Sequence, residues 1–278
     1  MKKISRRSFL AAAAVSVAAL AMTACGGSAS SAASSVASSA ASSEAASSAA
    51  AADLTTVEAG KLTMATNAAF PPYEMTTDAG EFEGIDVDTA KAIAEKLGLE
   101  LQIDDMDFDA ALLSVQQGKA DIVMAGVTVT DERKAVMDFS DSYATGIQSI
   151  IVPNDSDIAS PDDLAGKTIG TQRGTTGYIY CSDDFGDENV VAYDDGLTAV
   201  QALNNGQVDA VVIDNAPAQE FVAANPGLKV LDTSYAEEDY AIGMAKGSAL
   251  EDAVNKALEE LKADGTLQAI VDKYIKAE

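Results

Sequence analysis

One phrase occurs twice in this chain, 88 positions apart. Residues 115–126 read VQQGKADIVMAG, and residues 203–214 read LNNGQVDAVVID. In both copies an apolar position precedes two amides and a glycine, and an aspartate then precedes an apolar run. Glycine ends a helix at little steric cost, and a short apolar run is typical of a buried strand. The phrase therefore predicts a helix followed by a strand, in each of two similar units.

The segments around each copy predict the same order of elements, which is strand, helix, strand, helix, strand. In the first unit these segments are 61–67, 86–98, 99–104, 108–118 and 120–126. In the second unit they are 167–171, 176–181, 189–194, 197–206 and 208–214. Such an order is typical of a parallel or mixed sheet covered by helices. The expected fold class is α/β with two lobes, each built on one sheet, and with a ligand cleft between them, because ligands bind beyond the carboxyl ends of parallel strands.

The remaining folded segment, 240–278, contains a strand and two helices that have no counterpart after the first unit. We expect this segment to complete the first lobe, so that the chain crosses between lobes near residues 145–147 and 239–241 and forms a hinge. The predicted domains are lobe 1 over 58–145, lobe 2 over 146–239, and the C-terminal part of lobe 1 over 240–278.

The first 57 residues read as targeting and tethering segments. A basic start is followed by an apolar run of 13 residues and by TAC, which ends at Cys25. The run is too short to span a membrane, so residues 1–24 predict a signal peptide of the lipoprotein type, with Cys25 as the lipid attachment site. Met22 stands where such cleavage sites usually have leucine, and SRRSFL leaves the twin-arginine and general export routes both open. Residues 25–57, rich in serine and alanine, predict a flexible tether.

Composition excludes several functions. The net charge of −26 disfavours binding to nucleic acid and to anionic lipid. The chain has no histidine, which removes Ser-His and Cys-His nucleophiles and most zinc sites. The acidic run at 104–109 lacks the glycine and glutamate of a calcium-binding EF-hand, and GTQRGTTG at 170–177 lacks the ending of a nucleotide phosphate loop. We expect no metal and no cofactor.

Two charged residues lie at or beyond the ends of the strands in the repeated phrase. Arg133 lies in the first turn of a helix that Thr130 caps, where a guanidinium can grip a carboxylate in a bidentate way. The alternative for Arg133 is a surface ion pair with Asp131 or Glu132. Asp214 ends its strand, where it can face a ligand cation or cap the following loop.

Several motifs resemble the polar amino acid-binding proteins of ABC importers, solute-binding family 3. They are FPPYE, GIDVDTAKAIAEKLG, MDFDAALLSVQQGKADIVMAGVTVTDERKAVMDFSDSY, GKTIGTQRGTT and NNGQVDAVVIDNAPA. The resemblance covers residues 61–274. It implies a ligand site made of Asn67, Phe70, Phe108, Gly126, Thr128, Arg133, Gln172, Thr176 and Asp214.

The resemblance also implies a role for each of these residues. Arg133 would clamp the α-carboxylate of an amino acid, assisted by Thr176 and the backbone of Thr128. Asp214 would pair with the α-ammonium group, helped by the Gly126 carbonyl. One strand end therefore offers an anion and the other a bare backbone, because the ligand is a zwitterion.

The side chain of the ligand would meet a mixed pocket. Phe70 and Phe108 would flank it, although aromatic residues at strand ends also complete cores. Asn67 and Gln172 would read its polar groups. Asn67 stands where an aspartate is frequent in the family, which favours a neutral polar amino acid over a cationic one. Arg173 is expected to be a solvated charge at the rim.

The implied protein is a monomeric, lipid-anchored receptor outside the cell membrane. It would deliver a free L-amino acid to ABC permease subunits and their ATPase, with no role in nucleic acid binding. Two alternatives remain, an enzyme similar to cyclohexadienyl dehydratases on the same fold and a ligand-binding module of a sensor. The enzyme would need a general acid in the cleft besides Asp214.

Overall fold

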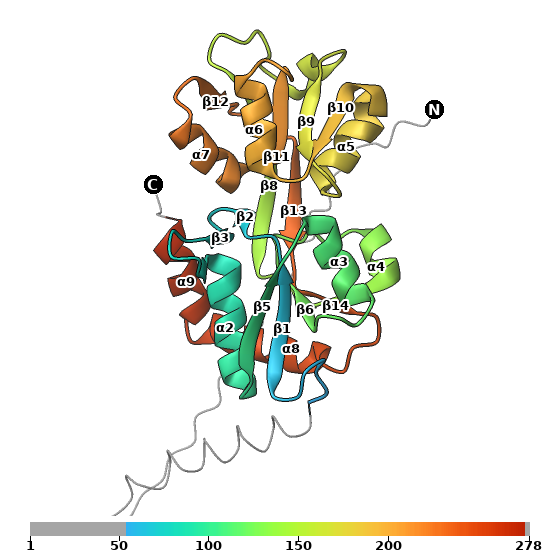
Figure 1. The fold of residues 1–278 in the computed structure, drawn as a ribbon, viewed down its shortest axis with the longest axis vertical. Helices are drawn as coiled ribbons and strands as arrows, with labels where there is room; N and C mark the ends of the chain where they lie inside the picture. Colours follow the sequence, from blue (N-terminus) through green and yellow to red (C-terminus); the bar gives the residue numbers. More distant parts are fainter. Residues whose placement is uncertain (1–53, 276–278) are drawn as a thin grey trace, which may run out of the picture. The chain divides into compact units, whose positions relative to one another are not determined.

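The computed structural model describes residues 54–275, so the predicted signal peptide, Cys25 and most of the tether lie outside the described residues. The described part contains one five-stranded, one six-stranded and one three-stranded sheet (Figure 1). The five-stranded sheet has the order β5-β1-β6-β14-β7. Its strands are β1 (Lys61–Thr66), β5 (Glu100–Asp105), β6 (Ile122–Val123), β7 (Met137–Phe139) and β14 (Gly243–Ala245).

The six-stranded sheet has the order β10-β9-β11-β8-β12, and β13 pairs with β8. Its strands are β8 (Ala144–Pro153), β9 (Ile169–Gln172), β10 (Val190–Tyr193), β11 (Ala210–Asp214), β12 (Leu228–Val230) and β13 (Ala236–Tyr240). The small sheet joins β2 (Ala69–Phe70), β3 (Glu74–Thr76) and β4 (Phe82–Glu83). In the two large sheets β1 and β9 pair in parallel with both neighbours, whereas β8 and β14 pair antiparallel. Both sheets are therefore mixed.

Most helices lie where the sequence predicts them, but the segment after Asp214, expected to be a loop, forms helix α7 (Asn215–Ala224). The helices are α2 (Ile85–Leu97), α3 (Phe108–Gln116), α4 (Asp131–Val136), α5 (Thr176–Phe185), α6 (Gly196–Asn204), α7, α8 (Glu251–Ala263) and α9 (Thr266–Tyr274), with short 3₁₀ turns at Pro161–Leu164 and Asp187–Asn189. The apolar stripe of α2 is buried, and the helix ends at Gly98 with a φ of 70°. None of the helices within residues 54–275 is both long and apolar enough to cross a membrane.

The repeated phrase makes the same contacts in both units. In each unit the helix, α3 or α6, gives way to a glycine with positive φ, Gly118 or Gly206. In the first unit the carboxylate of Asp121 accepts a hydrogen bond from the backbone N–H of Thr63 at 2.8 Å. In the second unit the carboxylate of Asp209 accepts one from the backbone N–H of Thr168, also at 2.8 Å. The aspartate thus fixes each new strand against its parallel neighbour.

The strand predicted over 120–126 is shorter than expected. Only Ile122–Val123 form β6, and the chain then turns away at Gly126, whose φ of 55° is left-handed. The equivalent strand β11 continues to Asp214 because β8, its neighbour on the side away from β9, pairs with it from Val211 to Asp214.

Two antiparallel strands connect the large sheets. β8 leaves the first sheet after β7, and β13 returns to it before β14 (Figure 1). Their register places Ala236 opposite Gln148 and Tyr240 opposite Ala144. The returning segment then adds β14 to the first sheet, between β6 and β7, and α8 and α9 follow. The domain boundaries at 58, 146 and 240 remain a prediction.

Candidate functional site

The predicted site residues of both units meet where strands end. Asn67 directly follows β1 and Gln172 ends β9, and Nε2 of Gln172 donates a hydrogen bond to Oδ1 of Asn67 at 2.8 Å. Asn67 also donates to the carbonyl of Met106 at 3.0 Å, and Gln172 donates to the carbonyl of Asp194 at 3.2 Å. Both amides are buried. This amide pair joins the two units at the site.

A small cavity of about 10 Å³ lies beside the amide pair. It is lined by Asn67, Phe70, Glu74, Phe108, Ala125, Gln172 and Thr175. A space of this size holds no more than about one water molecule. The two units, or the side chains between them, must therefore move apart to admit a larger ligand, which would then meet aromatic rings, amides and a carboxyl group.

Arg133 is a buried cation, and only some of its N–H donors bind the protein. Its helix α4 begins after Thr130, whose hydroxyl accepts a hydrogen bond from the Arg133 backbone N–H, as the sequence predicts. The guanidinium donates to the carbonyls of Thr128 at 2.7 Å and Gly174 at 3.1 Å, and it lies 5.4 Å from the centre of the Phe108 ring.

Burial lowers the pKa of Arg133, and the charge of Glu238 opposes this shift. Among residues 54–275, no carboxylate lies within 4.0 Å of the guanidinium, so the surface ion pair considered for Arg133 is not formed. Two of its five N–H groups bind protein carbonyls, which leaves donors for a ligand carboxylate.

Asp214 is a buried anion at the end of β11. Its Oδ2 accepts a hydrogen bond from Nε2 of Gln148 at 2.8 Å, and its Oδ1 accepts one from the hydroxyl of Tyr240. The side chain does not cap α7, although Asp214 occupies the N-cap position. Burial raises the pKa of Asp214 to about 7; the hydrogen bond from Tyr240 lowers this pKa, and the negative charge of Glu238 raises it further. The charge of Asp214 therefore needs a cation to be stable near neutral pH.

Phe70 and Phe108 are both buried and both line the small cavity. Phe70 stacks on Tyr73 with ring centres 5.9 Å apart. A Cβ atom on Gly126 would lie 2.8 Å from the Phe70 ring, so glycine is required for the close approach as well as for the turn. The backbone N–H of Gly126 donates to Asp86 at 2.9 Å, which orients this strand end.

The predicted threonines lie between the two units. The hydroxyls of Thr128 and Thr176 are 3.5 Å apart, and both residues are buried. Thr175 caps α5 by accepting a hydrogen bond from the Tyr178 backbone N–H. Arg173 is half exposed, with Nε 3.7 Å from a carboxylate oxygen of Asp194. Arg173 is thus a solvated charge, whereas the threonine hydroxyls face one another.

Sequence reasoning did not select Glu74 as a site residue. Glu74 belongs to the FPPYE motif and is fully buried in the wall of the small cavity. Neither of its carboxyl oxygens has a hydrogen-bond partner among the described residues. Burial raises the pKa of Glu74 well above its usual range, and the nearby carboxyl group of Asp86 raises it further. Its position after two prolines in a short motif was the available signal.

A second set of missed residues surrounds Asp214. Gln148 on β8 donates to both Asp214 and Glu238, at 2.8 Å and 3.0 Å. The ring of Tyr240 fits against Gly146, where an added Cβ would overlap it. No local motif marks these residues, because their partners lie far away in the sequence.

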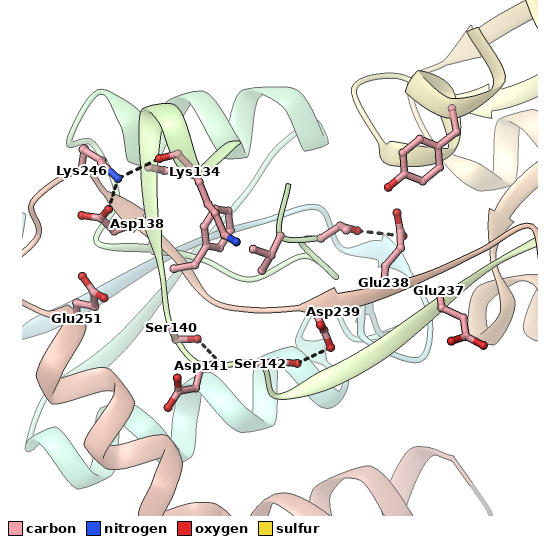
Figure 2. Close-up of a pocket in the computed structure, with 15 residues that line it drawn as sticks. Lys134, Asp138, Ser140, Asp141, Ser142, Glu237, Glu238, Asp239, Lys246 and Glu251 are labelled. Atoms are coloured by element: carbon pink, nitrogen blue, oxygen red, sulfur yellow. Dashed lines mark hydrogen bonds and ion pairs between the residues drawn. The ribbon is translucent and has the colours of Figure 1, made fainter. Parts of the chain in front are cut away.

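Another cavity, with a volume of about 680 Å³, lies beside the connecting strands. Its walls carry many acidic residues, several of them labelled in Figure 2, including Asp138, Asp141, Glu237, Glu238 and Asp239. Two lysines, Lys134 and Lys246, are also in the wall, and Lys246 pairs with Asp138 at 2.5 Å. Within residues 54–275 no group of three or more metal-ligating side chains could hold a metal ion. Thr128, a predicted site residue, and Glu238 also line this cavity.

The geometry suits a ligand that carries both charges. Among residues 54–275, the buried guanidinium of Arg133 has no acidic partner within 4.0 Å, and the buried carboxylate of Asp214 has no basic one. Burial strengthens ion pairs that a ligand completes, because the local dielectric constant is low. A small zwitterion satisfies both groups at once.

Comparison with known proteins agrees with this chemistry. The chain is 34% identical over 228 residues to the arginine-binding extracellular protein ArtP of Bacillus subtilis, covering 78% of this chain and 87% of that protein. It is 33% identical over 225 residues to the L-cystine-binding protein TcyJ of Escherichia coli, covering 80% and 85%.

Among solved structures, the arginine-, lysine-, histidine-binding protein ArtJ of Geobacillus stearothermophilus has 35% identity and a TM-score of 0.75, covering 78% of this chain and 96% of that one. The two-lobed α/β architecture expected from the sequence is therefore confirmed as the type II periplasmic-binding-protein fold. The model of the bacterial extracellular solute-binding proteins, family 3, matches residues 62–277, and this chain belongs to that family.

Proposed function

We propose that this protein captures a free L-amino acid outside the cell membrane and delivers it to the permease of an ABC importer. The observation that carries the proposal is the pair of buried, oppositely charged groups Arg133 and Asp214, neither of which has an ionic partner among the described residues. Membership of a family of amino acid-binding proteins supports it.

In this proposal the two ends of the amino acid bind separately. Arg133 grips the α-carboxylate, with Thr176 and the backbone of Thr128 as further donors. Asp214 accepts the α-ammonium group, together with the carbonyl of Gly126. Closure of the two units around the ligand removes water, which strengthens both ion pairs. The ligand favours the closed state only to the extent that it binds that state better than the open one.

The side chain of the ligand is proposed to be cationic, as in arginine. Burial in the cavity wall raises the pKa of Glu74, so a cationic side chain placed in the cavity would stabilise the ionised form of Glu74. The proteins ArtP and ArtJ, by name, bind arginine. The second candidate is the neutral polar side chain expected from Asn67, and the amide pair of Asn67 and Gln172 favours it.

The protein is proposed to work as a monomer that a lipid on Cys25 holds at the membrane, after residues 1–24 are removed. Family membership supports a location outside the cytoplasm. The anchor is tested by mass spectrometry of the membrane fraction, where Cys25→Ala should release the protein into the soluble fraction.

We infer that the protein performs no catalysis. Glu74 could serve as the general acid that the dehydratase alternative requires. Asp214, however, adds a second buried carboxyl group to the proposed site, which disfavours a substrate such as prephenate that carries two carboxylates and no amine. Formation of an aromatic product from prephenate or arogenate would overturn this inference.

The first test is thermal unfolding of the protein after it has been unfolded and refolded to remove bound ligand. Each common L-amino acid, citrulline and prephenate are added separately. A ligand at 1,000 times its dissociation constant adds about 4 kcal/mol to the free energy of unfolding. That corresponds to a rise in Tm of about 8–16 °C for a chain of this size. No shift with any amino acid would refute the proposed function.

The identity of the side chain is tested with Glu74→Gln. Arginine and citrulline have nearly the same shape but differ by one positive charge. If Glu74 pairs with a cation, the variant should lose about 10- to 100-fold in arginine affinity and change little for citrulline. Glu81→Gln removes an exposed carboxylate nearby and should change neither. Equal losses for both ligands would favour the neutral candidate.

A further inference from the structure

Strand β13 carries three consecutive acids, and only the middle one is buried. Glu237 and Asp239 are exposed, whereas Glu238 is only 6% exposed. Among residues 54–275 no lysine or arginine lies within 4.0 Å of Glu238. Burying a carboxylate without a close cation is costly. Such a group is therefore expected to have a role that an apolar residue could not fill.

A single oxygen of Glu238 accepts two hydrogen bonds. Its Oε2 accepts one from the hydroxyl of Thr128 at 3.1 Å and one from Nε2 of Gln148 at 3.0 Å. Figure 2 shows Glu238 with the hydrogen bond that it receives from the neighbouring segment. The other oxygen, Oε1, has no hydrogen-bond partner among the described residues. The hydrogen bonds from Thr128 and Gln148 therefore converge on one oxygen of Glu238, and the Tyr180 hydroxyl also faces this carboxylate.

Both partners of Glu238 also bind the charged groups of the site. Gln148 donates to Oδ2 of Asp214 at 2.8 Å through the same nitrogen. The carbonyl of Thr128 accepts a hydrogen bond from Nη1 of Arg133 at 2.7 Å. One carboxylate is thus connected, through one residue on each side, to the cation and to the anion of the proposed ligand clamp.

The location of Glu238 adds a second argument. It lies on β13, one of the two strands that connect the large sheets, whereas Gln148 lies on the other, β8. Thr128 follows the first sheet, and its backbone forms a β-bridge with Tyr240 at the end of β13. The contacts of Glu238 therefore join the connecting strands to both sides of the site.

We propose that Glu238 is a positioning residue of the amino acid site, which orients the Gln148 amide and the Thr128 hydroxyl so that both ends of the ligand are held in register. This inference rests on the proposed function, because it names a further residue of the same site. Glu238 acts through its partners and does not touch the ligand.

The charges around Glu238 are consistent with this role. Its negative charge favours the protonated, charged form of Arg133 and raises the pKa of Asp214. Tyr180 from α5 and Tyr240 from β13 also face it, and both have a pKa raised mainly by burial. Glu238 is thus a buried carboxylate whose charge acts on both Arg133 and Asp214.

The test compares two variants of similar volume. Glu238→Gln keeps one carbonyl oxygen, which can accept both hydrogen bonds at the place of Oε2. Glu238→Met keeps the length but provides no strong acceptor. The matched control is Glu237→Gln, which removes an exposed charge from the adjacent position. Affinity is measured by titration calorimetry with the amino acid that stabilises the wild-type protein most, and stability by urea unfolding.

We expect Glu238→Met to weaken binding by about 10- to 100-fold, the range typical for losing hydrogen bonds to a charged group. Glu238→Gln should bind within about fivefold of wild type, and Glu237→Gln within about twofold. The Met variant should keep or gain stability, because an apolar residue replaces an unpaired buried charge. Wild-type affinity in Glu238→Met, or equal losses in the Gln and Met variants, would overturn the proposal.

Two further arms keep the inference testable on its own. If Glu238→Met does not fold, Thr128→Val removes only the hydroxyl that binds Glu238 and should weaken binding by about 3- to 10-fold; unchanged affinity would overturn the proposal.

If the wild-type protein binds no amino acid, the proposed function fails, and the side-chain amide NMR signals of Gln148 then test the inference. They should shift in the Met variant and stay in place in Glu237→Gln, and unshifted signals would refute it.

Discussion

If Asp214 holds the α-ammonium group, as proposed, its ionisation should make amino acid binding depend on pH. In the ligand-free protein burial raises the pKa of Asp214 to about 7. The proposed partner of Asp214 is an α-ammonium group, which pairs only with the charged carboxylate. Below pH 7 the carboxyl group must therefore lose its proton when the ligand binds.

The magnitude follows from proton linkage. With a pKa of about 7, roughly 3% of Asp214 is ionised at pH 5.5 and about 90% at pH 8. The apparent affinity should thus fall by about 30-fold from pH 8 to pH 5.5. Two other buried acids face the same region, Glu74 and Asp86, and burial also raises their pKa values, that of Asp86 to about 6. If Glu74 also ionises to meet a cationic side chain, arginine should release up to one more proton than citrulline.

The assay is titration calorimetry between pH 5.5 and 8, in pairs of buffers that differ in ionisation enthalpy, so that protons released on binding are counted directly. Asp214→Asn should bind weakly but without the 30-fold pH dependence.

The ligand-free Asp214→Asn variant should also be more stable than the wild-type protein at pH 8, by up to about 4 kcal/mol, since a pKa raised from 3.8 to about 7 is a difference of about 3 units. The sign is fixed: the native state binds more protons than the unfolded chain between pH 4 and 7, so the free energy of unfolding falls as pH rises through that range. Affinity that stays constant from pH 5.5 to 8 with no proton release would refute the reasoning.

Three further substitutions test the site and the core. Arg133→Ala should cost about 2–5 kcal/mol of binding free energy, because a buried ligand carboxylate loses its partner; wild-type affinity would rule out this clamp. Gly146→Ala should displace the Tyr240 ring and weaken binding by about 1–3 kcal/mol in calorimetry, whereas Gly227→Ala, with open space around it, should not. Leu258→Ala should lower the free energy of unfolding by about 2–5 kcal/mol in urea, because the side chain is fully buried in α8, and a change under 1 kcal/mol would contradict that packing.

The helices and strands could be predicted where the local sequence pattern agrees with how the folded chain packs. The helix α2 has a continuous apolar stripe and a terminal glycine, so its prediction over 86–98 differs from Ile85–Leu97 by one residue at each end. The prediction of a strand over 120–126 was too long, because an apolar run does not reveal where the backbone turns. That limit comes from Gly126, whose φ and close approach to Phe70 depend on the folded chain.

The residues of the candidate site likewise divide into those that the sequence could select and those that only the fold reveals. Arg133 and Asp214 could be selected because they lie at or beyond the strand ends of the repeated phrase, but only the family resemblance gave them roles toward a ligand. Gln148 and Glu238 could not be selected, because the hydrogen bond between them joins positions 90 residues apart. Glu74 was part of a recognised motif, yet its burial in the cavity wall depends on how the small sheet of β2, β3 and β4 is placed by the rest of the fold.

The two strand ends with which the chain repeats itself now have different physical roles. At the first, Gly126 provides a bare backbone, since a Cβ would collide with Phe70. At the second, Asp214 provides a charge that Gln148 and Tyr240 hold in place. Buried charges without ionic partners reduce stability, and natural proteins retain such strain mainly where function needs it. In the proposed function a zwitterionic ligand supplies the missing partners, so the groups that weaken the empty protein would stabilise the filled one.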